Sequence, residues 1–221
     1  MKPWSQSTVA EYRGLPLRAH GYFADVPVYD IWRVDLPGLG RSCTMLDVRA
    51  TMRAMSSEPP SVPVRSLFAL RALLGRLFHW DASQADTRDD SWRARLAAQD
   101  VDSSLVPTGT RDGAFSILYV HDAEAASEIR NRTVHAFLVL AIEPNAGGHS
   151  LLLAIHVLPV SFWTRPYLAL IKPFRLWIVY PSWLQRLHDA WIRGGAIDPA
   201  TDRRGSEVAS STDRPDAEPG R

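Results

Sequence analysis

Two long apolar segments, residues 133–142 and 151–158, constrain the fold of this chain more than any other feature. Both are rich in β-branched, aromatic and aliphatic residues, which is typical of β-strands. The segment 143–150 between them contains a proline, an asparagine and two adjacent glycines, which predicts a hairpin loop. Because neither segment alternates apolar with polar residues, both faces of this antiparallel hairpin must be covered by other parts of the chain.

The C-terminal segment 166–193 is the expected cover. Its large apolar residues recur at roughly helical spacing, at Leu168, Ile171, Phe174, Ile178, Leu184, Leu187 and Trp191. Pro173 and Pro181 should kink or divide this helix, because proline removes a helix hydrogen bond outside the first turn. A further strand is expected at 115–120 and an amphipathic helix at 64–78. The sequence thus predicts an α+β fold in which a short antiparallel sheet and a C-terminal helical segment enclose an apolar core or cavity.

The chain length suits one domain, which we place at residues 20–197. Residues 1–19 are expected to be a flexible N-terminus. Residues 198–221 contain Val208 as their only large apolar residue and are therefore expected to be disordered. Residues 82–113 are rich in Asp, Ser, Arg and Gly, which predicts a mobile loop.

Composition and charge exclude several classes of protein. The formal net charge is only +1, so the chain has no overall field that would favour nucleic acid. Its single cysteine, Cys43, cannot form an intramolecular disulfide, and the N-terminus lacks the apolar run of a secretory signal, so we expect a cytoplasmic protein. The apolar stretch 167–184 is interrupted by charges and prolines, which argues against a membrane-spanning helix.

Two cations, Lys172 and Arg175, lie in this apolar stretch beside Trp177. They could hold a carboxylate or phosphate at a cavity mouth or at a membrane surface. Alternatively, their stems cover apolar surface while their charged ends reach water. Trp163 and Trp177 could line a pocket for a flat apolar ligand or form an interfacial belt, although core packing is the simpler explanation of most tryptophans.

His135 and His156 lie on the two expected hairpin strands. Either could face a cavity as a proton donor or ligand contact near neutral pH. The alternative is a structural histidine bonded to backbone or to a carboxylate. Arg132, at the start of the first strand, could belong to a polar rim that orients a ligand, or to a surface ion pair. Two histidines are too few for a metal site, so we predict no metal and no cofactor.

Three stretches of sequence carry a resemblance to a known family: residues 131–135 (NRTVH), residues 66–78 (SLFALRALLGRLF) and residues 167–181 (YLALIKPFRLWIVYP). They resemble the family called domain of unknown function 2867, which is found alone or behind a short-chain-dehydrogenase-like Rossmann domain. The resemblance spans roughly residues 20–193. It implies a START-like (SRPBCC-type) helix-grip fold, in which an antiparallel sheet curls around a long C-terminal helix with a cavity between them.

The family provides no activity to carry over. This chain contains only a fragment of the dinucleotide-binding fingerprint, at residues 37–42, so the resemblance implies a separate oxidoreductase as a potential partner. No nucleophile elbow, zinc-protease helix or phosphate-binding loop occurs in the sequence, which lowers the expectation of catalysis.

The sequence therefore favours a binding module for a hydrophobic or amphipathic small molecule in a cavity between sheet and helix. The expected ligand-binding residues are Arg132, His135, His156, Trp163, Lys172, Arg175 and Trp177. One alternative is a peripheral membrane or partner-binding protein that uses its Arg/Trp-rich helices. Another is a cyclase- or isomerase-like enzyme that uses the same cavity.

Overall fold

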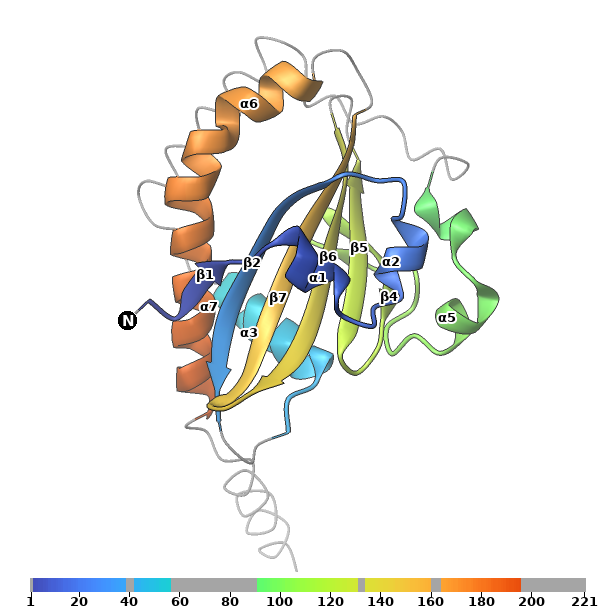
Figure 1. The fold of residues 1–221 in the computed structure, drawn as a ribbon. Helices are drawn as coiled ribbons and strands as arrows, with labels where there is room; N and C mark the ends of the chain where they lie inside the picture. Colours follow the sequence, from blue (N-terminus) through green and yellow to red (C-terminus); the bar gives the residue numbers. More distant parts are fainter. Residues whose placement is uncertain (1, 39–41, 57–90, 131–133, 160–163, 196–221) are drawn as a thin grey trace, which may run out of the picture.

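The computed structural model describes residues 2–38, 42–56, 91–130, 134–159 and 164–195. At its centre lies an antiparallel seven-stranded sheet in the order β1-β2-β7-β6-β5-β4-β3 (Figure 1). The strands are β1 (Trp4–Gln6), β2 (Val28–Pro37), β3 (Arg111–Asp112), β4 (Phe115–Val120), β5 (Glu124–Arg130), β6 (Val134–Asn145) and β7 (Gly148–Pro159).

The helices lie on both faces of this sheet. They are α1 (Val9–Arg13), α2 (Ala19–Tyr22), α3 (Met45–Ser56), η2 (Trp92–Arg95), α5 (Ala98–Asp102), α6 (Thr164–Phe174), the π-helical turn η3 (Arg175–Val179) and α7 (Tyr180–Gly195). From α6 to α7 the chain forms one long, bent helical segment beside β2 (Figure 1). Its α7 part packs against α3, β1 and β2. The α+β class and the C-terminal helix are thus as predicted.

The predicted hairpin is confirmed. Strands β6 and β7 pair antiparallel from Val134 opposite Pro159 to Asn145 opposite Gly148. Gly148 has a φ of 135°, and a Cβ atom there would lie 2.8 Å from the backbone nitrogen of Gly38. Glycine is therefore required at this turn, where the backbone of another segment passes close to the hairpin.

Both faces of the hairpin are buried, also as predicted. Leu151 and Leu153 of β7 belong to a core that contains Leu184 and Leu187 of α7. The intervening Leu152 and its like-facing neighbours pack instead in a second core with residues of α1, α2 and η2, namely Tyr12, Ala19 and Trp92. The C-terminal helix thus covers one face, while N-terminal segments and residues 91–102 cover the other.

The N-terminal segment, residues 1–19, was expected to be flexible, but its described residues form regular structure. It contains β1 and α1, and α1 begins at a capping box in which Thr8 and Glu11 bond reciprocally. Tyr12 is fully buried in the second core. Capping and the burial of one aromatic ring offset the ordering entropy of a segment whose composition is otherwise polar.

Only part of the expected mobile loop 82–113 lies within the described residues, and that part contains regular structure. Residues 91–112 contain η2, α5 and β3, whereas residues 82–90 lie outside the described part of the chain. The expected helix at 64–78 and the tail at 198–221 also lie outside it. Strand β5 was missed from the sequence because its buried face carries Glu124 and Glu128, which make the segment read as polar.

The division of the C-terminal helix falls between the two prolines. Pro173 lies at the end of α6 and Pro181 in the first turn of α7, with the π-helical turn η3 between them. Neither proline has an N–H to donate to the turn before it, so the regular hydrogen-bond ladder is interrupted where the helix changes direction.

Replacing a buried leucine of α7 by alanine should destabilise the fold much more than the same replacement at an exposed leucine of α6. Leu187 is fully buried in the core, so Leu187→Ala should lower the free energy of unfolding by about 2–5 kcal/mol. Leu170 of α6 is 58% exposed, so Leu170→Ala should change it by less than about 0.5 kcal/mol. Urea titrations followed by circular dichroism measure both, and equal losses would contradict the assigned packing.

Candidate functional site

The seven expected site residues do not form one site. Arg132 and Trp163 lie outside the described residues. His135 and His156 point into the second core, away from the C-terminal helix. Lys172 and Trp177 are exposed. Arg175 alone reaches a group of residues beneath the helix in which Asp30 and Trp32 are buried and Tyr29 is 38% exposed.

That group, called here the Arg175 cluster, consists of Tyr29, Asp30, Trp32, Arg175 and Tyr180. Asp30 and Trp32 are two residues apart on β2 and face the helix together. The Arg175 Nε atom lies 2.9 Å from Asp30 Oδ2, and the Tyr180 hydroxyl donates to the same oxygen at 2.9 Å. The guanidinium lies over the rings of Tyr29 and Tyr180, at 5.1 and 5.9 Å from their centroids. Strand β2 and η3 thereby enclose a cation among aromatic rings.

Charge within the Arg175 cluster is balanced. Asp30 is buried at the position where it neutralises Arg175, which is what permits both ions to leave water. Burial, together with the negative charge of Asp30, raises the pKa of Tyr180 far above its usual range. Tyr180 therefore remains a protonated donor to the Asp30 carboxylate at all physiological pH values.

Three N–H groups of the cluster have no hydrogen-bond partner within the described residues, although one of them, Arg175 Nε, is paired electrostatically with Asp30. Trp32 is 5% exposed and its Nε1 atom has no hydrogen-bond partner within the described residues; the same holds for Nη2 of Arg175, whose side chain is 13% exposed. Both side chains lie against Tyr180, since the Trp32 ring centroid is 5.3 Å from that of Tyr180. Buried donors are normally bonded, and an unsatisfied one costs about 1–3 kcal/mol.

Arg175 is also the first residue of the π-helical turn. Such turns are rare and occur frequently at functional sites. The sequence pointed to Arg175 because it is a cation in an apolar stretch. Nothing in the sequence singles out its partner, since Asp30 lies in the segment 28–36, which also contains Arg33 and Asp35.

His135 has the structural role that was left open as an alternative. Its Nε2 atom lies 3.0 Å from Glu128 Oε2, and Glu128 also accepts from the Ser91 hydroxyl and from the backbone N–H of Trp92. Burial acts to raise the pKa of Glu128, but the hydrogen bonds outweigh it, so that this pKa falls below its usual value. The ionised carboxylate ties η2 to the sheet.

His156 is likewise satisfied by its neighbours. Its Nδ1 atom lies 3.0 Å from the carbonyl oxygen of Val26, which can only accept, so Nδ1 carries the proton. The Nε2 atom then accepts from the Tyr12 hydroxyl at 2.9 Å. Burial lowers the pKa of His156, which keeps the ring neutral.

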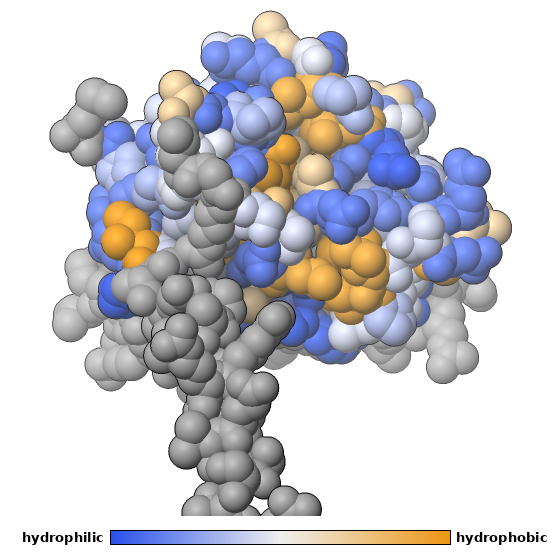
Figure 2. Space-filling view, turned by 90° about the horizontal axis from the view of Figure 1, so that it is seen from below, coloured by the Kyte–Doolittle hydropathy of each residue, from blue (hydrophilic) through white to orange (hydrophobic). Residues whose placement is uncertain are grey.

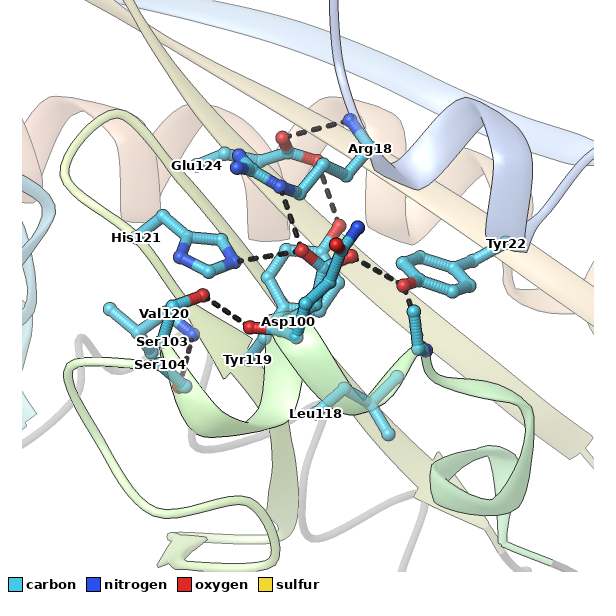
Figure 3. A network of polar contacts seen from close by, with 12 residues as sticks. Arg18, Tyr22, Asp100, Ser103, Ser104, Leu118, Tyr119, Val120, His121 and Glu124 are labelled. Atoms are coloured by element: carbon cyan, nitrogen blue, oxygen red, sulfur yellow. Dashed lines mark hydrogen bonds and ion pairs between the residues drawn. The ribbon is translucent and has the colours of Figure 1, made fainter.

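A second polar network centres on Asp100 (Figure 3). Asp100 accepts from Arg18 Nε at 3.0 Å and from the Tyr22 hydroxyl, and His121 Nε2 lies 3.9 Å away. Nearby, Glu124 accepts from the backbone N–H of Arg18 and from the Tyr119 hydroxyl. The network joins α2, α5 and the β4–β5 turn, which sequence could not foresee because these segments are far apart along the chain.

An open groove of about 770 Å³ adjoins this network at the ends of strands β4, β5 and β6. Leu17, Leu105 and Ile142 contribute apolar walls, and Arg18 and Glu124 contribute polar ones. Seen from below, the molecule shows hydrophobic patches among hydrophilic residues (Figure 2). Arg18 and Glu124 are already bonded within the protein, whereas His121 Nε2 and Glu143 Oε1, which also line the groove, have no hydrogen-bond partner among the described residues.

Within the described ranges, no group of three or more His, Cys, Asp or Glu side chains could hold a metal ion. No helix in the same part of the chain is long and apolar enough to cross a membrane.

Fold and site together define an α+β protein with a seven-stranded antiparallel sheet, a C-terminal helix and a buried ion pair between them. The model of the family described as "Protein of unknown function (DUF2867)" matches residues 22–182. The chain belongs to this family, as its sequence resemblance suggested. No curated protein and no solved structure matches the chain.

Acidification should destabilise the protein through His156. Below about pH 6.5 a histidine in the unfolded chain takes up a proton, whereas the buried ring does so only at lower pH, so stability falls across that interval. Urea unfolding at about pH 7.5 and about pH 5.5 measures this loss. His156→Gln should be about 1–3 kcal/mol less stable at the higher pH but lose less on acidification. Equal losses in both proteins would contradict the assignment.

Proposed function

We propose that this protein is a non-catalytic binding module for a hydrophobic or amphipathic small molecule, held between the sheet and the C-terminal helix in a START-like helix-grip arrangement. The observation that carries the proposal is the Arg175 cluster, a largely buried cation among aromatic rings at the π-helical turn between α6 and α7. Small-molecule sites have this composition, with mostly apolar walls and a few placed polar groups.

The position of the cluster supports binding over a purely structural role. An ion pair buried only for stability can usually be replaced by apolar side chains at no cost, so it is weak evidence of a stabilising function. Here the cluster also holds buried donors that have no hydrogen-bond partner among the described residues, which lowers stability further. A bound molecule that accepts these hydrogen bonds would remove this cost to stability.

Nile red, a neutral apolar dye, tests the proposal. Its fluorescence should rise on binding, and ligands extracted into organic solvent from the purified protein should appear in mass spectra. The double variant Asp30→Asn, Arg175→Gln removes both charges without leaving one unpaired, so it should fold and bind the dye about tenfold more weakly.

Arg13→Gln is the matched control, because Arg13 is exposed on α1, at the opposite face of the sheet, and should leave dye binding unchanged. Thermal unfolding confirms that each variant is folded. Equal dye binding by the wild type and the double variant, or no binding by the wild type, would reject the site.

A second candidate function rests on the outer face of the same helical segment. Leu170, Phe174 and Trp177 are 58%, 40% and 77% exposed, and their i, i+4, i+7 spacing places them on one stripe. The exposed Lys172 lies on the same helical segment. An apolar stripe with tryptophan and a nearby cation is typical of helices that lie in a membrane interface.

Vesicle sedimentation measures this second activity. If the stripe inserts, Trp177→Ala should reduce binding to anionic phosphatidylserine-containing vesicles about tenfold, because it removes the most exposed aromatic ring. Leu105→Ala, at a half-exposed leucine near the groove, is the control and should have no effect. Absence of sedimentation at low salt would exclude the membrane function but leave the ligand site untouched.

A further inference from the structure

We infer that the ligand of the Arg175 cluster presents a neutral oxygen acceptor, such as the carbonyl of a ketone or ester, on an apolar body. This inference rests on the proposed binding function and specifies the class of molecule bound. It follows from two independent properties of the cluster: which polar atoms lack partners, and how its charges are balanced.

The first property is the kind of group that is missing. Within the described residues, the cluster's buried polar atoms without a hydrogen-bond partner are Trp32 Nε1, Arg175 Nη2 and Arg175 Nε, the last at ion-pair distance from Asp30, and all are N–H donors. A ligand that satisfies them must supply lone pairs. An alkane cannot do so, and an ammonium group carries only donors.

The second property is the balance of charge. Arg175 is already paired with Asp30 through Nε, and Tyr180 donates to the same carboxylate oxygen. A carboxylate or phosphate ligand would therefore add a second negative charge to a buried site that holds one positive charge. An uncompensated buried charge costs more than a lost hydrogen bond between neutral groups. Although cations in an apolar stretch suggested an anionic ligand, the presence of Asp30 reverses that expectation.

The walls of the cluster fit an apolar body beside such an acceptor. The ring centroids of Trp32 and Tyr180 are 5.3 Å apart. The ring of Tyr29 also contacts the Arg175 guanidinium. Flat aromatic surfaces of this kind favour apolar groups by burial and do not require a charge. The acceptor therefore sets the orientation of the ligand, while the rings contribute most of the binding energy.

Four compounds of equal chain length test the inference: an alkyl methyl ketone, the carboxylic acid, the primary amine and the alkane. Each is titrated at neutral pH as a competitor of Nile red on the full-length protein. The ketone should bind tightest, with the acid, the amine and the alkane each about tenfold weaker, which corresponds to the loss of one or two neutral hydrogen bonds.

Trp32→Phe removes one donor and keeps an aromatic ring, so it should weaken the ketone about fivefold and leave the alkane unchanged. Trp183→Phe, at a partly buried tryptophan of α7 in the same core, is the matched control and should change neither. Unfolding curves show whether the two variants retain the stability needed for the comparison.

The outcomes separate this inference from the proposed function. If all four compounds displace the dye equally, the site binds apolar molecules but does not select an acceptor, and the inference is wrong. If the acid binds tightest, the charge argument is wrong and the ligand is an anion. If the wild type binds neither dye nor compounds, the proposed function and the inference both fail.

Discussion

The β6–β7 hairpin has to exclude water from both of its faces, and the other elements are arranged to meet that requirement. Leucines alternate between two cores along β7, so each face needs its own cover. The C-terminal helix α7 covers one face, and short N-terminal and mid-chain helices cover the other. The C-terminal helical segment follows β7 in sequence, but the other cover comes from residues 9–22 and 91–102, so the sheet holds together segments that are far apart along the chain.

Buried polar groups accompany both covers, and among the described residues both covers hold some that are satisfied and some that are not. On the face of α1 and η2, His135, His156 and Glu128 have protein partners at normal distances. Such satisfied networks fix the position of the covering segments. On the helix face, the Arg175 cluster leaves donors without acceptors at a π-helical turn. Because His20 Nε2 and Arg93 Nε on the other face also lack partners among the described residues, the reason to place ligand binding beneath the C-terminal helix is the combination of unsatisfied donors, aromatic rings and a balanced ion pair at one place.

Part of the candidate site could be predicted from the sequence. Arg175 stood out as a cation within an apolar stretch, and that reasoning needs no knowledge of neighbours. The sequence indicated His135 and His156 as ligand contacts, but their nitrogen atoms have partners within the protein. A residue type alone cannot reveal whether its nitrogen atoms are already bonded. Asp30 decides the charge of the site, yet it is separated from Arg175 by most of the chain, so only the pairing of β2 with the helix connects them.

What the sequence determined by itself is local: the hairpin, its need for cover on both faces, the strand β4, the C-terminal helix and its interruption near two prolines. These follow from periodicity and backbone chemistry, which act over a few residues. Only the tertiary structure decided which segment covers which face, that residues 2–19 fold, and that Glu124 and Glu128 can lie in a buried strand. Those outcomes depend on hydrogen bonds and contacts between distant residues, whose energies no local pattern encodes.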